Sequence, residues 1–162
     1  MKKILSVIFI VLAMCSMPIA ALADGSENYA VPSGKITNVV YQNDGSYFVT
    51  TIAETKSPAL RASTTTKTSS KITTYYGSSG NTLWYVKVTG TFSYNGSTSS
   101  CTASTVTAAA PASNWSISST SASKSGNQAT ASATANRYNG LTVVQTVSRT
   151  VTLTCSSNGT LS

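Results

Sequence analysis

The sequence predicts an all-β fold, an antiparallel β-sandwich of about seven to eight strands. Short runs rich in Val, Thr, Ile and Tyr alternate with Asn-Gly, Asp-Gly and Ser-Gly pairs, which is typical of strands joined by tight turns. No window after residue 23 repeats apolar residues at helical spacing. Two of the three cysteines, Cys101 and Cys155, lie in this β-rich part and predict one inter-sheet disulfide.

The N-terminus predicts a secretory signal peptide over residues 1–23. Two lysines precede an apolar run from Ile4 to Met14, and an Ala-Leu-Ala exit ends at Ala23. The run is shorter than the roughly 20 residues that a membrane-spanning helix needs. Lipidation of Cys15 stays open as an alternative, because Leu-Ala-Met-Cys resembles a bacterial lipobox. We therefore expect a secreted, extracellular protein, which is released or held noncovalently at the cell wall because no sorting motif follows the strands.

The remaining chain divides into three predicted parts. Residues 24–54 form an N-terminal β-hairpin segment that turns at an Asn-Asp-Gly sequence, residues 55–70 form a Ser/Thr-rich linker, and residues 71–162 form the sandwich body. An alternative for the linker region is one long edge strand over 63–76. The strands that alternation and turn residues predict are, in order, 35–42, 46–54, 70–77, 82–94, 98–109, 114–124, 128–137 and 141–155.

The hairpin around Asn95-Gly96 has the clearest register. A two-residue type I′ turn there would place Gly90 opposite Cys101. Alternation then puts one apolar face inward, and a glycine beside a cysteine leaves space for a sulfur from the facing sheet. The inward face of this strand carries Trp84, Val86, Val88, Gly90 and Phe92.

The last hairpin pairs an alanine face with a valine face. Ala129, Ala131, Ala133 and Ala135 share one parity, and a three-residue loop that includes Tyr138 would set them opposite the valines of the final strand. Gly140 would then take the left-handed position of a bulged hairpin. The same parity points Cys155 toward the core.

Two resemblances agree with this architecture. Cys101, Trp115 and Cys155 resemble the Cys, Trp, Cys spacing of an immunoglobulin-like sandwich, although Leu153 stands where such domains carry a corner tyrosine, so the resemblance implies the sandwich rather than that topology. The stretches LWYVKVTGTFSYNG (83–96) and TVTLTCSSNGTLS (150–162) are similar to an uncharacterised family of small secreted β-sandwich proteins of Gram-positive bacteria. That likeness covers the chain from about residue 70 and implies export and an all-β body, with no active site.

The distribution of titratable groups argues against an enzyme. No Asp or Glu follows Glu54, and the whole chain lacks His. General acid/base pairs, Ser-His-Asp triads, two-carboxylate sites and most metal sites all need those side chains. A serine-lysine pair near Lys71 or Lys124 is a weak alternative, because a lysine base needs burial. We therefore predict no catalytic residue, no metal and no cofactor.

The sequence favours a secreted, non-enzymatic β-sandwich that binds a cell-surface or extracellular component. The formal net charge of +7 favours an anionic cell-wall polymer or a glycan as partner. The dispersed Lys and Arg residues do not favour nucleic acid, and membrane contact is expected only through the cleaved signal peptide. Two alternatives stay open, a membrane-active toxin or antimicrobial protein and a structural or adhesive surface protein, and the oligomeric state is open as well. Possible ligand-stacking residues are Tyr75, Tyr76 and Tyr85.

Overall fold

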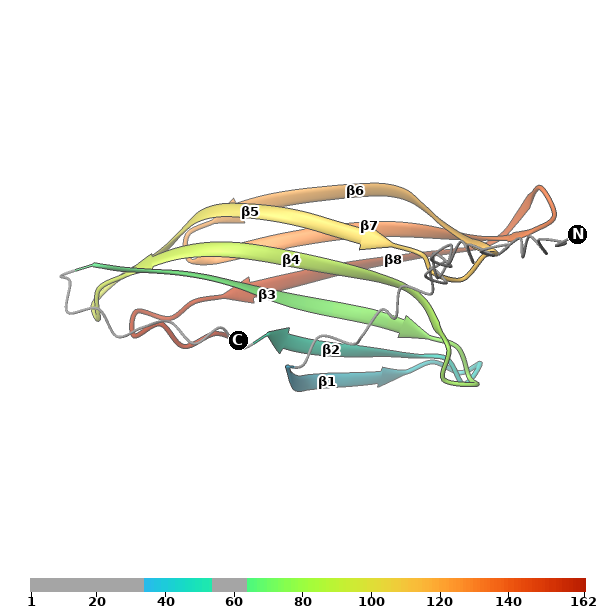
Figure 1. Ribbon diagram of the computed structural model, residues 1–162, viewed down its shortest axis with the longest axis horizontal. Helices are drawn as coiled ribbons and strands as arrows, with labels where there is room; N and C mark the ends of the chain where they lie inside the picture. The colour runs from blue at the N-terminus through green and yellow to red at the C-terminus, as the bar shows by residue number, and fades with distance from the viewer. Residues whose placement is uncertain (1–33, 54–63) are drawn as a thin grey trace, which may run out of the picture. The chain divides into compact units, whose positions relative to one another are not determined.

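The computed structural model describes residues 34–53 and 64–162, which form eight antiparallel strands in two sheets (Figure 1). Five strands make the first sheet and three make the second, each in chain order. The described ranges contain no helix. The predicted all-β, antiparallel fold is confirmed at this level. The strands are β1 (Lys35–Tyr41), β2 (Tyr47–Ala53), β3 (Thr65–Tyr76), β4 (Thr82–Tyr94), β5 (Ser99–Ala109), β6 (Trp115–Ser125), β7 (Gln128–Asn139) and β8 (Thr142–Thr154).

Each predicted strand has a counterpart, and β3 differs most from its prediction. It begins at Thr65, so residues 65–70 belong to a strand rather than to a linker. Its Thr-rich start pairs with β4 and its later part with both β2 and β4, which makes β3 an interior strand and not the edge strand considered as the alternative. The predicted signal peptide, residues 24–33 and residues 54–63 lie outside the described residues.

The β1–β2 hairpin is part of the five-stranded sheet. β2 pairs with β3 in unbroken register from Tyr47 opposite Tyr76 to Ala53 opposite Ser70. Through this pairing, the part of the predicted N-terminal hairpin that is described continues the sheet that also contains β4 and β5.

The core lies between β4 of the first sheet and β7 and β8 of the second. Alternate residues of β4 face inward and are fully buried, as the sequence predicts, and they meet the alanine row of β7. Alanine is small, so β7 approaches β4 closely: a Cβ built on Gly90 would lie 2.7 Å from the Cβ of Ala129. The buried residues shared by the two sheets include Trp84, Val86, Val88, Phe92, Trp115, Ala129, Ala131, Ala133, Ala135, Val151 and Leu153.

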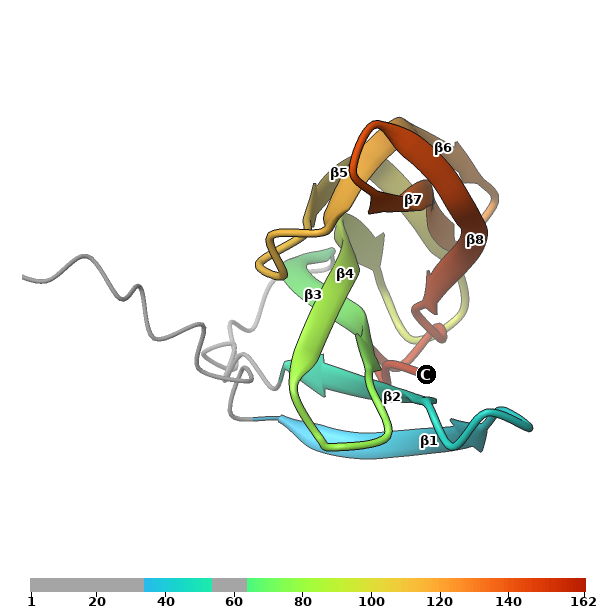
Figure 2. The same ribbon diagram turned by 90° about the vertical axis from the view of Figure 1, so that its right-hand side faces the viewer.

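The second sheet covers only part of the first. β7 packs on β4 and β5, β8 packs on β4 and β3, and β5 runs beside β6, whereas the backbones of β1 and β2 approach no strand of the second sheet. Figure 2, which looks along the molecule from one end, shows β8 and the C-terminal residues reaching down toward β2. The inner face of β1 and β2, with the part of β3 that β8 does not reach, is therefore left without a covering strand.

The register predicted for the β4–β5 hairpin is wrong. Tyr94 pairs with Ser99, and the loop has four residues instead of two. Asn95 explains the longer loop, because its side-chain oxygen accepts from the N–H groups of Ser97 at 3.0 Å and Thr98 at 2.8 Å. In the described residues only glycines have positive φ, which excludes the type I′ turn that needs positive φ at Asn95.

The β7–β8 hairpin has the predicted parity, but its loop and its residue pairs differ from the prediction. Three of the four alanines face valines or leucine, as in Ala131 opposite Val151, whereas Ala133 faces Arg149. Gly140 has a φ of 59°. However, the loop holds only two residues, and the extra residue is a bulge at Val144. A bulge and a longer loop each add one residue to one strand, so either restores the same parity.

The predicted disulfide is not formed in this structure, where Cys101 and Cys155 are buried free thiols. The four-residue β4–β5 loop sets Phe92, rather than Gly90, opposite Cys101. The space above Gly90 is filled by the Phe92 ring and by Ala129, which leaves no room there for an incoming sulfur.

The strand order also differs from that of an immunoglobulin domain. Neighbouring strands in both sheets are consecutive in the chain, whereas immunoglobulin sheets contain Greek-key crossovers. Trp115 is nevertheless a core residue, with 6% of its surface exposed. The Cys, Trp, Cys spacing thus reflects a shared core and not the immunoglobulin topology.

Candidate functional site: a cationic groove

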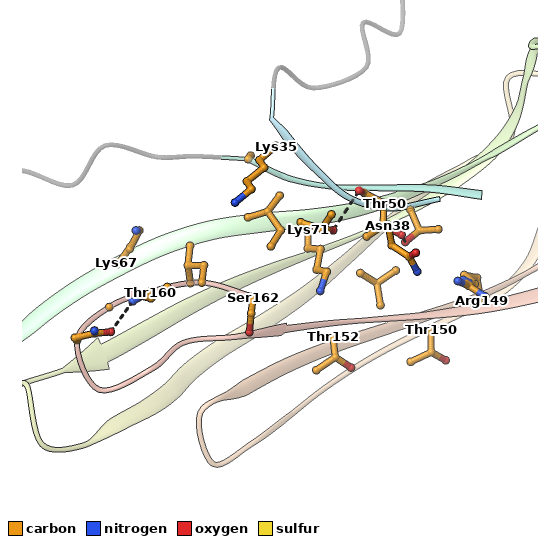
Figure 3. A pocket seen from close by; sticks show the side chains of 18 residues that line it. Lys35, Asn38, Thr50, Lys67, Lys71, Arg149, Thr150, Thr152, Thr160 and Ser162 are labelled. Carbon is orange, nitrogen blue, oxygen red and sulfur yellow. Dashed lines mark hydrogen bonds between the residues drawn. The ribbon is translucent and has the colours of Figure 1, made fainter. Parts of the chain in front are cut away.

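A groove of about 930 Å³ occupies the uncovered inner face of the larger sheet. This volume is at the upper end of the range of about 300–1,000 Å³ that small-molecule sites occupy. Its floor comes from β1, β2 and β3, one wall comes from four consecutive residues of β8, and the end is closed by residues 158–162 (Figure 3). The mismatch between five strands and three is what leaves this space open.

Four basic side chains line the groove: Lys35 of β1, Lys67 and Lys71 of β3, and Arg149 of β8. Lys67 and Lys71 lie opposite Phe92 and Val88 of β4, which places them on the inner face. Cations therefore occupy inner-face positions that β4 fills with apolar side chains. In Figure 3 the ammonium groups of Lys35 and Lys71 point into the groove.

Arg149 crosses from the smaller sheet toward the larger one. Its guanidinium carbon lies 4.6 Å from the ring centroid of Phe48 on β2, within the range of a cation–π contact. Phe48 is itself buried against Tyr75, with ring centroids 4.5 Å apart. A fixed aromatic face thus holds this cation at the mouth of the groove.

No acidic side chain lines the groove. Within the described ranges the only acidic residue is Asp44, in the β1–β2 turn. Hydrogen bonds from Ser46 hold the pKa of Asp44 below its usual value, and the carboxylate is committed to that turn. Burial lowers the pKa of Lys71, because its ammonium group is partly removed from water. An anion entering the groove would offset that loss.

The end wall is fixed by packing and backbone hydrogen bonds. Gly159 has a φ of 83° and lies directly against the ring of Tyr94, where an added Cβ would come within 2.5 Å of a ring carbon. The N–H of Gly96 also donates to the carbonyl of Ser157 at 2.8 Å. The C-terminal turn is therefore attached to the β4–β5 hairpin, and the groove is a preformed feature.

The three predicted ligand-stacking tyrosines separate in space. Tyr75 is only 3% exposed and packs in an edge-to-face contact against Trp115, so it belongs to the core and cannot stack on a ligand. Tyr76 and Tyr85 lie on the outer face of the larger sheet, where burial is intermediate. None of the three lines the groove.

Tyr76 belongs to a ladder that was not foreseen from the sequence. Tyr41, Tyr47 and Tyr76 are register neighbours on β1, β2 and β3, with successive ring centroids 5.5 and 5.1 Å apart. The rings of Tyr47 and Tyr76 stack on one another, so each ring covers one face of the other. Tyr41, which is 73% exposed, is the outermost member.

From the sequence, Lys71 was considered only as a base and the other cationic residues of the groove were missed, although two signals pointed to them. Arg149 shares the inward parity of Val147 and Val151, and Lys67 and Lys71 share one parity of β3. A charge at an inward position of a strand is unusual. These signals indicate a common site only when the sheet order is known, because it is the fold that brings β3 and β8 together.

The groove offers charge and hydrogen bonding, with lysines, one arginine, Thr and Ser hydroxyls and amide groups. The other lysine considered as a base, Lys124, donates to the backbone carbonyl of Thr102 at 2.6 Å.

Within the described ranges no group of three or more His, Cys, Asp or Glu could hold a metal ion. The same ranges contain no helix of the length and hydropathy needed to cross a bilayer. Comparisons with protein-family models, curated proteins and solved structures find no match to this chain.

Proposed function

We propose that this protein is a secreted, non-enzymatic β-sandwich that binds an anionic cell-surface or extracellular component, such as a cell-wall polymer or an acidic glycan, in the cationic groove. The observation that carries the proposal is the convergence of four cationic side chains from three strands on one groove that no acidic side chain lines. Positive charge held in a confined, partly dry space favours anions more strongly than the same charge spread over the surface.

The cost of keeping these charges supports a binding role. Partial burial of Lys71 disfavours its charged form, and the neighbouring strand β4 shows that apolar side chains fit the same inner face. Replacing buried charges by apolar residues is often neutral or stabilising. A cationic inner face is therefore explained better by a ligand than by stability.

Binding to immobilised poly(glycerol phosphate), measured over a salt series, tests the proposal. We expect Lys67→Glu with Lys71→Glu to weaken binding by about tenfold or more, because two attractive contacts become repulsive. Lys87→Glu with Lys124→Glu is the matched control, since it makes the same change in net charge away from the groove. Equal losses in the two variants, or binding that does not respond to salt, would contradict a groove site.

A membrane-active role is the second candidate, favoured by the tip of the β7–β8 hairpin. Leu141 is 100% exposed at the turn, and Val143 and Val144 beside it are 44% and 50% exposed. Tight turns usually carry Gly, Asn, Asp or Ser. An exposed leucine in this turn therefore favours contact with an apolar partner such as a lipid bilayer. Dye release from anionic liposomes that disappears in Leu141→Asp would support this role; intact liposomes would remove it.

We also propose that the secreted protein carries the Cys101–Cys155 disulfide. The N–H groups of the two cysteines donate to consecutive residues of the β6–β7 turn, Cys101 to Gly126 at 2.7 Å and Cys155 to Asn127 at 3.0 Å. Both backbones thus flank one short turn. Bond formation would remove a hydrogen from each thiol and pass two electrons to an external thiol-oxidising partner. Alkylation of the denatured, unreduced protein should label neither cysteine, and labelling of both would contradict the bond.

A further inference from the structure

The groove runs along the edge of β8. β8 is the last strand of its sheet, and four consecutive residues, Arg149 to Thr152, line the groove. Successive side chains of a strand point to opposite faces of the sheet. A wall that includes both parities is therefore the edge of the strand rather than one of its faces, as Figure 3 shows for Thr150, Thr152 and Arg149.

The backbone of this edge is open to a partner strand. The N–H of Thr154 donates to the carbonyl of Ser162 at 2.9 Å, and the N–H of Ser162 donates back to the carbonyl of Thr154 at 3.0 Å. The polar groups of Thr154 thus point away from β7. Because this direction alternates along a strand, Thr152 and Thr150 point their N–H and carbonyl groups the same way. Among the described residues no strand pairs with that side of Thr150 or Thr152.

A strand added at this edge would fit the space. It would lie about 4.8 Å from β8 and face the inner surface of β1–β3 at a typical sheet-to-sheet spacing of about 10 Å. Every second side chain of the added strand would point at the floor, where Lys35, Lys67 and Lys71 gather. Acidic residues at alternate positions would match those cations.

The lining discriminates between kinds of anion. A sulfated or phosphate polymer supplies acceptors for the lysines but no regular donors for the open carbonyls of Thr150 and Thr152. No aromatic residue lines the groove, so sugar rings would find no stacking surface there. An extended peptide supplies a donor and an acceptor at every second residue, together with carboxylates.

On this basis, and resting on the groove function proposed above, we infer that the ligand is an extended acidic peptide that adds a fourth strand along the free edge of β8. Main-chain hydrogen bonds to Thr150 and Thr152 hold the peptide. Carboxylates on alternate residues pair with the cations of β1, β3 and β8, which select an acid-x-acid pattern.

The test uses the full secreted chain and a labelled peptide of alternating Glu and Thr. Two matched peptides carry N-methyl groups on either the Glu or the Thr residues, since only one of these sets points its N–H groups at β8. We expect one methylated peptide to bind about tenfold or more weakly and the other to bind like the parent. The protein variant Thr150→Pro removes an edge N–H that no described strand uses, so it should fold and lose peptide affinity.

Hydrogen exchange and binding of poly(glycerol phosphate) distinguish a failure of strand addition from a failure of the anion-binding function. Hydrogen exchange at Thr150 and Thr152 should slow when the peptide binds and stay unchanged with poly(glycerol phosphate). If the phosphate polymer binds the groove while the peptide does not, or if both methylated peptides bind equally, strand addition is wrong and the anion-binding function stands. If neither probe binds, both proposals fall.

Discussion

The two sides of this two-sheet body differ in what their inner faces carry. Where β7 meets β4, the alanine row of β7 faces the apolar inner face of β4, and the sheets close to van der Waals contact around Gly90 and Ala129. Where β8 meets β3, the inner faces carry Lys71 and Arg149, and a groove remains. On both sides, inward and outward residues alternate along the strands in the same way. The strand-number mismatch leaves the groove open, and its inward residues differ from those of the closed side in carrying charge.

The largest effect is expected on the closed side, from Phe92→Ala. Phe92 is fully buried between the sheets, so its truncation should lower the free energy of unfolding by about 3–5 kcal/mol through lost burial and a residual cavity. Urea denaturation measures the change. Ser93→Ala, the adjacent outward position, is the control and should stay within about 0.5 kcal/mol. A loss in Phe92→Ala no larger than the control's would mean that the sheets do not close there.

A smaller loss is expected when the close approach itself is blocked, in Gly90→Ala. The new Cβ would meet the Phe92 ring at 2.6 Å and the Ala129 Cβ at 2.7 Å, and such overpacking costs about 1–3 kcal/mol. Adding Ala129→Gly removes one of these two contacts. In a double-mutant cycle the pair should therefore be less destabilised than the sum of the single variants. Strict additivity would show that the two positions do not touch.

Much of this fold could be predicted because alternation acts locally. The inward parity of β4 and the alanine row of β7 follow from period-2 patterning alone, and both are buried as expected. Register is more fragile, because one side chain or one bulge changes it. Asn95 lengthened one loop through its side-chain hydrogen bonds, and a bulge at Val144 replaced a longer loop in another hairpin.

The candidate site could not be predicted in the same way. Its cations lie on strands far apart in the sequence, and they share a groove only because the second sheet has too few strands to cover β1 and β2. Strand number per sheet depends on where the chain changes sheets, between β5 and β6, which patterning does not reveal. Tyr75 shows the same limit: its neighbour Tyr76 faces outward, and only the register assigns Tyr75 to the core.

The open side should respond to substitution in the opposite direction, which Lys71→Met tests. Removal of a partly buried charge should raise the free energy of unfolding at pH 7 slightly, by up to about 0.5 kcal/mol, with Lys87→Met as the control for net charge.

Burial lowers the pKa of Lys71 below that of a lysine in the unfolded chain, about 10.4. The unfolded chain therefore holds this proton more tightly. As a result, wild-type stability should gain from deprotonation of Lys71 as the pH rises through the alkaline range up to that value. Lys71→Met lacks this contribution, so its stability advantage should shrink with rising pH. An advantage that is constant with pH, or a loss of stability at pH 7, would show that the lysine is well accommodated and that the groove holds no unmet charge.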